Sequence, residues 1–169
     1  MIDLKKLRLA CINNSRKLLE KSYEEYKTYN WEYAAFLAIT AYEEALKARL
    51  VKTFEEKQLT EKSFKNIWLR HDLKLLSQHA KISVYENIST GETSMEFEIP
   101  KKNEIRDPQS IDDILITRNN SLYVDFKDEL IYSPKEMVKQ KHALKYIKKA
   151  KQTLEWEEMM IDIEKKLKQ

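Results

Sequence analysis

The chain has 169 residues and a formal net charge of +3, with 35% charged and 42% hydrophobic residues. One glycine and three prolines are too few for a turn-rich β-sandwich. A single glycine also excludes a glycine-rich phosphate loop and the glycine-flanked turn that carries a hydrolase serine. The net charge is too small to indicate a nucleic-acid binder by bulk electrostatics, so only a local basic patch would serve that function.

The length predicts a single domain over residues 1–169, built around one hydrophobic core. Cys11 is the only cysteine, so no intramolecular disulfide can form, which is typical of a reducing compartment. No secretory signal is evident, and the most apolar stretch, Tyr33 to Tyr42, is about half the roughly 20 residues of a membrane span. We expect a cytoplasmic protein that makes no use of a membrane.

Two long helices are predicted first. Residues 3–28 form one, with Asp3 as its N-cap, and the other begins at Trp31 after the N-cap candidate Asn30. The second helix carries a seam of small side chains that permits close approach of a neighbouring helix: Ala34, Ala38, Ala41, Ala45 and Ala48. Its other seam is apolar except for one carboxylate: Phe36, Ile39, Glu43, Leu46 and Leu50.

Glu43 is therefore expected to be buried. An unpaired buried carboxylate is very costly, so Glu43 needs a cation or hydrogen-bond donors, and Arg118 is the candidate partner. Lys47 follows Glu43 by four residues, the favourable order for an intrahelical ion pair, and Glu44 lies beside it. The structural alternative is a buried ion pair that only fixes helix register.

A third helix is predicted over residues 61–80. It contains His71, which opens the block His71-Asp72-Leu73-Lys74. Histidine is the side chain that ordinarily titrates near neutral pH, so His71 is a candidate general acid or base. The alternative is a structural or solvated histidine.

A small β-hairpin or irregular insertion is predicted around residues 82–100, within an insertion of about residues 82–108. Ser89-Thr90-Gly91-Glu92 is a turn signal, and apolar residues alternate with polar ones from Met95 to Ile99.

A helix returns over residues 110–122, with Ser110 as a candidate N-cap, and the chain then reaches its most unusual polar cluster. Arg118, Asn119, Tyr123 and Asp125 lie within ten residues, with apolar residues among them. An arginine can grip phosphate bidentately, and a phenol at this spacing can lie near it. The alternative is a helix end whose Asn and Asp side chains satisfy backbone groups.

The last helix is predicted over about residues 134–167, because Ser133-Pro134-Lys135-Glu136 is a capping box with proline at the first helical position. The stretch from Lys139 to Lys151 is free of acidic residues and would be a solvated face or, alternatively, a nucleic-acid face with strongly salt-dependent RNA binding. The basic residues of this stretch are Lys139, Lys141, His142, Lys145, Lys148, Lys149 and Lys151.

These elements predict an all-α, up-and-down bundle of four to five helices with the small insertion described above. No His, Cys or carboxylate cluster has metal-ligand spacing, so we expect neither a metal nor a cofactor.

The order and spacing of four blocks resemble the AbiV family of abortive infection proteins, from about Ala10 to Ala150. The blocks are Tyr42 to Ala48, His71 to Lys74, Arg118 to Asp125, and the Ser133-Pro134 helix start. This resemblance implies a bundle like those of the HEPN superfamily, many of whose members are metal-independent ribonucleases that act as dimers.

The resemblance also implies roles for particular residues. The superfamily signature is an arginine, a polar residue and then a histidine; Arg118 and Asn119 match it, whereas Tyr123 stands where the histidine would be. The arginine would hold the scissile phosphate and the histidine would activate the RNA 2′-hydroxyl. A phenol, whose ordinary pKa is about 10, is a poor base at pH 7. His71 would replace the missing imidazole if the third helix packs beside Arg118.

Two hypotheses follow. In the first, a dimeric antiphage effector arrests growth or translation on infection, and in its enzymatic form it is a metal-independent endoribonuclease. Its catalytic residues would be Arg118, Asn119, Tyr123 and His71, supported by Glu43, Glu44, Lys47 and Asp125. In the second, a non-catalytic dimeric module sequesters a phage-encoded or translation-machinery protein through the same residues. A structural bundle with no site is the third alternative.

Overall fold

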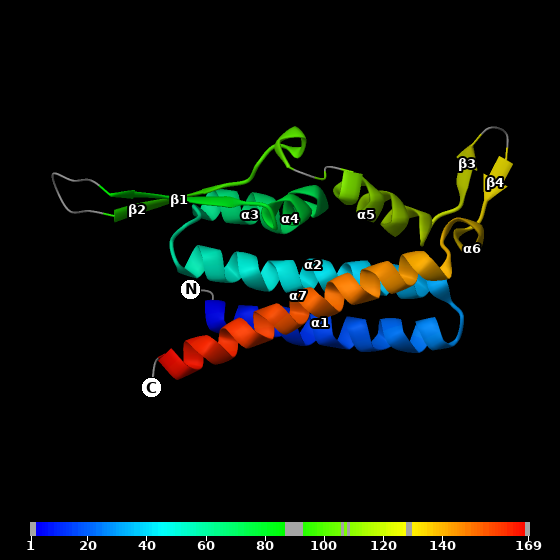
Figure 1. Cartoon of the computed structure of the whole chain (residues 1–169), viewed down its shortest axis with the longest axis horizontal. Helices are drawn as coiled ribbons and strands as arrows, with labels where there is room; N and C mark the ends of the chain where they lie inside the picture. Colours follow the sequence, from blue (N-terminus) through cyan, green and yellow to red (C-terminus); the bar gives the residue numbers. More distant parts are fainter. Residues whose placement is uncertain (1–2, 87–92, 106, 108, 128–129, 168–169) are drawn as a thin grey trace.

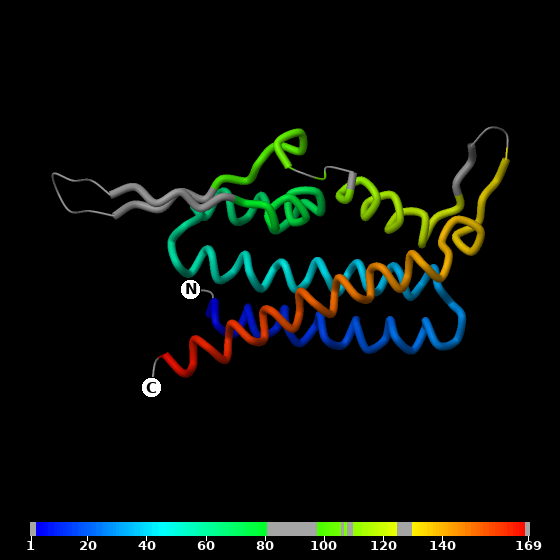
Figure 2. The backbone as a smooth tube through the Cα atoms, viewed as in Figure 1, coloured from blue at the N-terminus to red at the C-terminus, as the bar shows by residue number. Residues whose placement is uncertain are grey.

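The computed structural model describes residues 3–86, 93–105, 107, 109–127 and 130–167, and the side chains of 81–86, 93–97, 109 and 125–127 fall outside this description (Figure 2). The described residues form seven α-helices. The predicted all-α bundle is confirmed, but its described part has seven helices rather than four to five, because the third and the last predicted helices are each divided in two. The helices are α1 (Leu4–Lys27), α2 (Trp31–Glu55), α3 (Glu61–Leu69), α4 (His71–Ser77), α5 (Gln109–Asn120), α6 (Pro134–Met137) and α7 (Gln140–Leu167), with a 3₁₀ turn at Lys102–Glu104. The long helices α1, α2 and α7 lie together, and α3, α4 and α5 cover the remaining side of α2 (Figure 1).

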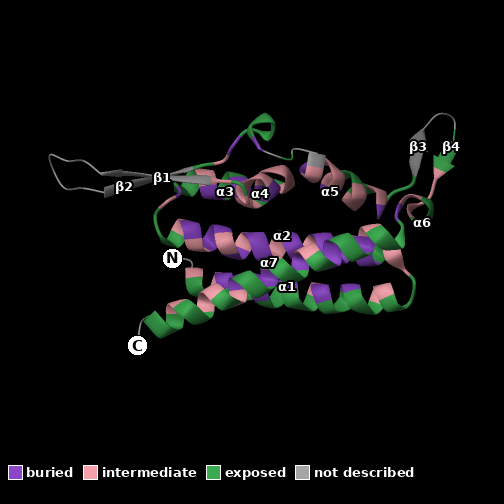
Figure 3. Cartoon of the chain, viewed as in Figure 1, coloured by how far each residue is buried: buried purple, intermediate pink, exposed green. Residues whose placement is uncertain are grey.

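The central helix is α2, most of whose residues are buried (Figure 3). Its five-alanine seam is fully buried, at 0% exposure. The hydroxyl of Ser15 on α1 donates to the Ala41 carbonyl, and that of Ser22 donates to the Ala34 carbonyl, both at 2.7 Å. Side chains as short as serine reach a neighbouring main chain only when the helices approach closely, as the alanine spacing predicts.

Enlarging one of these alanines is expected to destabilise the bundle. Ala38→Leu should lower the free energy of unfolding by about 1–3 kcal/mol, because the added carbons overpack a filled interior. Urea denaturation measures the change. Ala10→Leu, at an exposed position of α1, is the control and should stay within about 0.5 kcal/mol of wild type. Equal effects at the two positions would contradict the close approach of α1 and α2.

The caps at the helix starts differ in part from those predicted. Asp3 caps α1, accepting the Lys6 backbone N–H at 3.0 Å. Asn30 occupies the N-cap position of α2, but its side-chain amide donates to Glu25 Oε2 at 2.8 Å and does not cap the helix. The prediction of Ser110 as an N-cap is wrong, because Ser110 lies inside α5 and its backbone N–H donates to Asp107 Oδ1 at 3.2 Å.

The third predicted helix is divided in two at Arg70. This residue is extended, with φ −103° and ψ 124°, between α3 and α4. Its guanidinium bonds both carboxylate oxygens of Asp72, at 3.1 and 2.6 Å. Neither proline nor glycine marks the break, so helical periodicity alone does not show it. The consequence is that His71 begins a new helix.

The last predicted helix is also divided. The capping box is present, since the Ser133 backbone N–H and hydroxyl both donate to Glu136 Oε2 at 2.7 Å. It starts only the four residues of α6, however, and the long helix begins at Gln140 rather than Pro134. Between them Val138 is extended and 1% exposed, and it packs in a cluster with Ala34, Ala35 and Ala143. Burial of this side chain holds the break.

The insertion is the predicted hairpin. Strands β1 (Lys81–Glu86) and β2 (Thr93–Glu98) pair antiparallel, from Lys81 with Glu98 to Glu86 with Thr93. The expected turn residues Ser89 to Glu92 lie outside the described residues. A second hairpin that the sequence did not predict, β3 (Asp125–Lys127) with β4 (Leu130–Tyr132), follows α5. Among the described residues, none of the helices has the length and apolar character needed to cross a membrane.

Candidate functional site

Glu43 is the centre of a buried polar cluster. Its side chain on α2 is 3% exposed, and ionisable side chains from α4 and α5 converge on its two oxygens. His71 Nδ1 lies 2.5 Å from Oε2, and Lys74 Nζ lies 3.9 Å from the same oxygen. Arg118 Nε lies 3.6 Å from Oε1. The expected pair of Glu43 with Arg118 is therefore present, and α4 brings His71 and Lys74 to the same carboxylate.

The break at Arg70 explains how two residues of α4 reach Glu43. Because α4 starts at His71, His71 and Lys74 are three residues apart on one face of a helix, and that face meets α2. Arg118 lies in the last turn of α5, and its guanidinium carbon lies 5.8 Å from the centre of the Phe36 ring. The site thus needs three helices in place.

Positive charge exceeds negative charge in this cluster. Lys74 is 4% exposed, and burial lowers the pKa of its ammonium group, whereas Glu43 acts to raise that pKa. One carboxylate faces Lys74, Arg118 and the imidazole of His71. Arg118 Nε and Glu43 Oε1 are buried and too far apart for a hydrogen bond. Arg118 Nε–H is thus without a hydrogen-bond acceptor among the described residues, and a guanidinium is a group that bonds anions such as phosphate.

His71 is oriented by the carboxylate and remains accessible. Its side chain is 43% exposed, whereas Glu43 is buried. In a neutral imidazole whose Nδ1 donates to a carboxylate, Nε2 is the basic nitrogen. A carboxylate that fixes the tautomer of an accessible histidine is an arrangement suited to proton transfer.

Glu44 and Lys47 pair with each other. The predicted ion pair of Glu43 with Lys47 is not formed; Lys47 Nζ bonds Glu44 Oε1 instead and lies 5.1 Å from the centre of the Trp68 ring. The reason is that Glu43 is directed towards α4 and α5, where it has other partners. Glu44 and Lys47 therefore lie beside the Glu43 cluster.

Neither Asn119 nor Tyr123 joins the Glu43 cluster. The exposed Asn119 accepts the backbone N–H groups of Leu122 and Tyr123 through its carbonyl, at 3.0 Å each, as α5 ends. Tyr123 is 64% exposed, and among the described residues its phenol makes neither a hydrogen bond nor a ring contact. Asp125 begins β3, and its side chain is outside the description.

The basic residues of α7 do not all share one open face. Lys141, Lys145 and Lys148 are exposed on α7, and Lys139 is exposed just before it. Lys149, however, is partly buried, with its ammonium nitrogen 4.9 Å from the centre of the Tyr42 ring. Burial and then Lys145 lower its pKa.

Lys74 is the residue that sequence reasoning missed. It lies three residues after His71, so helical spacing alone places both on one side of a helix.

No group of three His, Cys or carboxylate side chains that could hold a metal ion occurs among the described residues.

A comparison with protein families assigns the chain. The model of the HEPN-type family described as AbiV matches residues 3–155. The chain belongs to the AbiV family. The match extends from α1 well into α7 and includes the four residues of the Glu43 cluster. AbiV membership associates the chain with abortive infection, a form of antiphage defence. No curated protein and no solved structure shows significant similarity to it.

Proposed function

We propose that this AbiV-family chain arrests growth or translation in infected cells by metal-independent cleavage of RNA at the Glu43 cluster. The observation that carries the proposal is the 2.5 Å contact of His71 Nδ1 with Glu43 Oε2, beside an arginine on the other oxygen. In this arrangement His71 is the base, Glu43 orients it, and Arg118 binds the phosphate.

In the proposed reaction, Glu43 keeps the Nδ1 proton of His71 in place, and Nε2 takes the proton of an RNA 2′-hydroxyl. The 2′-oxygen then attacks the adjacent phosphorus, and the 5′-oxygen leaves and takes a proton from the imidazolium. The products are a 2′,3′-cyclic phosphate and a 5′-hydroxyl. Arg118 stabilises the charge that develops on the phosphoryl oxygens, and the buried Lys74 adds positive potential. Each of these steps uses the side chains of this chain alone.

The proposal includes a homodimer. Large apolar side chains are exposed where α5 ends and β4 begins, at 38–71%: Leu122, Tyr123, Val124, Leu130 and Ile131. We call this set the apolar patch. An isologous contact would cover the patch with itself and would bring the Arg118 ends of two α5 helices towards each other.

The apolar patch also supports the second candidate function. Exposed tyrosine and aliphatic side chains are suitable anchors for a protein partner. A non-catalytic module would use the patch to sequester a phage-encoded or translation-machinery protein, and the Glu43 cluster would then only hold the helices together.

A ribonuclease assay in EDTA separates these functions. Protein purified from infected and from uninfected cells is incubated with cellular RNA, and the RNA ends are analysed. We expect cleavage that leaves 2′,3′-cyclic phosphates, and a loss of about 10²–10³-fold in Arg118→Ala, since this substitution removes a charge-stabilising donor. Arg16→Ala is the control, because Arg16 on α1 forms an exposed ion pair with Glu158 on α7 and has no part in the Glu43 cluster.

Light scattering shows whether each variant keeps its oligomeric state, and phage challenge shows whether it protects cells. Absence of cleavage by both wild-type preparations, or unchanged cleavage by Arg118→Ala, would contradict the catalytic proposal. Protection that survives loss of cleavage would favour the binding module.

A further inference from the structure

A second polar site lies along α5 and the start of α7. A pocket of about 530 Å³ opens between α5, α6 and α7. Thr117 and Asn120 line it from α5, and Lys141, His142 and Lys145 line it from the first turns of α7. No residue of the Glu43 cluster lines this pocket.

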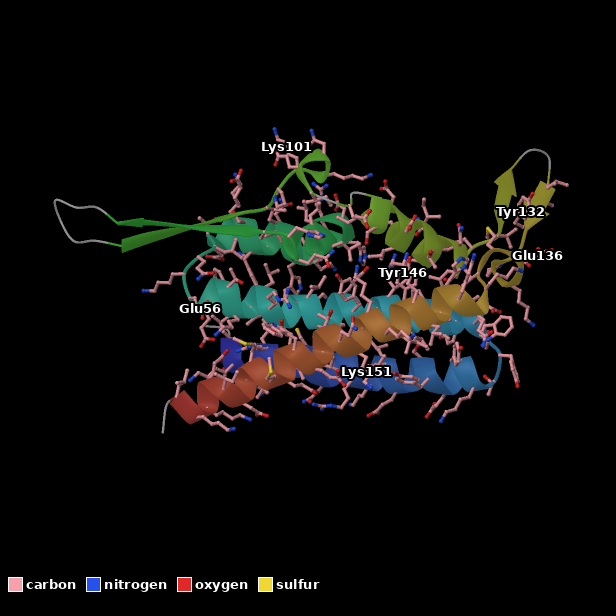
Figure 4. The ribbon with its side chains drawn as sticks, in the orientation of Figure 1. Glu56, Lys101, Tyr132, Glu136, Tyr146 and Lys151 are labelled. Carbon is pink, nitrogen blue, oxygen red and sulfur yellow. The ribbon has the colours of Figure 1, made fainter. Side chains whose placement is uncertain are left out.

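The break between α6 and α7 helps to form the pocket. Extended Val138 separates the two helices, so Met137 and Lys141 reach the pocket from different elements. Tyr146, labelled in Figure 4 between α5 and α7, also lines the pocket, and its hydroxyl lies 3.3 Å from that of Thr117. A continuous helix over residues 134–167 would not give this arrangement.

The lining favours an anion. Lys141 and Lys145 are exposed cations, whereas Asp113 is the acidic group among the described lining residues and lies 3.5 Å from Lys145. That pair is about half exposed on both sides, and such pairs are weak, so a phosphate can compete for Lys145. His142 Nδ1 accepts the Lys139 backbone N–H at 3.1 Å, which leaves Nε2–H as a donor.

The pocket also has the features needed for a base. Its volume exceeds what one phosphate requires, Ile116 and Met137 give it an apolar wall, and Asn120 offers an amide that can both donate and accept. Thr117 and Asn120 flank Arg118 on α5, so the pocket and the proposed phosphate ligand share one helix end.

We propose that this pocket binds one nucleotide of a single-stranded RNA whose scissile phosphate lies at Arg118. Lys141 and Lys145 hold the phosphate of the nucleotide in the pocket. The wall of Ile116 and Met137 contacts its base, and Asn120 forms hydrogen bonds with the edge of that base. This inference rests on the proposed function, because it names the substrate contact beside the reacting phosphate.

The test measures binding without cleavage. A fluorescein-labelled single-stranded RNA with 2′-O-methyl groups cannot undergo the proposed reaction, and its affinity is obtained from fluorescence anisotropy. Lys141→Ala/Lys145→Ala should weaken binding about tenfold, because two phosphate-contacting cations are lost. Lys148→Ala/Lys151→Ala removes the same charge from the same helix outside the pocket and should weaken binding about threefold or less. Asp113→Asn should strengthen binding.

A second measurement separates a nucleotide site from a simple anion site. The His142 ring proton resonance, assigned with His142→Gln, is followed by NMR while AMP or inorganic phosphate is added. We expect AMP to shift it at a lower concentration than phosphate does. Equal action of the two ligands, or equal losses in the two double-lysine variants, would overturn the inference.

The two proposals fail in different ways. If Arg118→Ala abolishes cleavage but Lys141→Ala/Lys145→Ala binds RNA as tightly as wild type, only the pocket inference is wrong. If the pocket binds AMP and RNA as expected but no preparation cleaves RNA, the catalytic proposal is wrong.

Discussion

His71→Gln is expected to lower RNA cleavage by about 10²–10⁴-fold, the range that a positioned general base contributes. Glutamine preserves a polar side chain that can contact Glu43, but it cannot take a proton from the 2′-hydroxyl. The single-turnover rate on a short RNA in EDTA measures the effect. RNA affinity should change little, because His71 acts on the hydroxyl proton and Arg118 holds the phosphate.

His79→Gln is the matched control, since His79 lies just after α4, is exposed and has no part in the Glu43 cluster. Its cleavage rate should equal that of wild type. The competing assignment makes Tyr123 the proton-transfer group, and it predicts that Tyr123→Phe loses as much activity as Arg118→Ala while His71→Gln stays active. That pattern would remove His71 from the mechanism.

Glu43→Gln is expected to lower the free energy of unfolding by about 3–5 kcal/mol at neutral pH, because it leaves a buried cation without its counter-charge. Lys74 is the cation concerned, at 4% exposure and 3.9 Å from Glu43. Urea denaturation measures the loss. Glu61→Gln is the control, because it removes a carboxylate that pairs with Lys65 at the exposed surface of α3, and it should cost about 1 kcal/mol or less.

Adding Lys74→Met to Glu43→Gln should restore most of the lost stability, since the unpaired charge is then gone. If the double variant is no more stable than Glu43→Gln, the loss arises from His71 or Arg118 and not from Lys74.

The pH dependence of Glu43→Gln follows from the same contact. Burial holds the pKa of Lys74 below its ordinary value of 10.5 in the folded protein. Between the folded and unfolded pKa values the unfolded chain binds more protons, so stability rises with pH in that window. The unfavourable contribution is complete below the folded pKa and disappears above the unfolded one. Because Glu43 raises the pKa of Lys74, its removal extends the window downwards. As the pH rises from neutral towards 10.5, the free energy of unfolding of Glu43→Gln should therefore increase more than that of wild type.

The helical regions and one half of the site could be predicted from the amino-acid sequence. The spacing of apolar residues depends on which side of a helix is covered, so it showed the alanine seam of α2 and the carboxylate of Glu43 within an apolar stripe. A buried carboxylate needs a cation, and this requirement led to Arg118. The blocks that resemble AbiV proteins are short stretches of sequence. Their order and spacing can be compared without a structure, and they were sufficient to indicate the family.

The positions of the helix breaks and the contacts between side chains of different helices depend on tertiary packing. Arg70 and Val138 interrupt helical patterns without proline or glycine. Burial of Val138 against α2 outweighs local propensity at the second break, whereas an exposed ion pair of Arg70 with Asp72 accompanies the first. Those breaks place His71 and Lys74 on Glu43 and help to form the pocket beside α7. Local spacing had put Tyr123 near Arg118, but α5 ends at Asn120 and leaves Tyr123 exposed. Periodicity specifies the buried face of each helix; the partner of that face is set by long-range packing, which neighbouring residues do not encode.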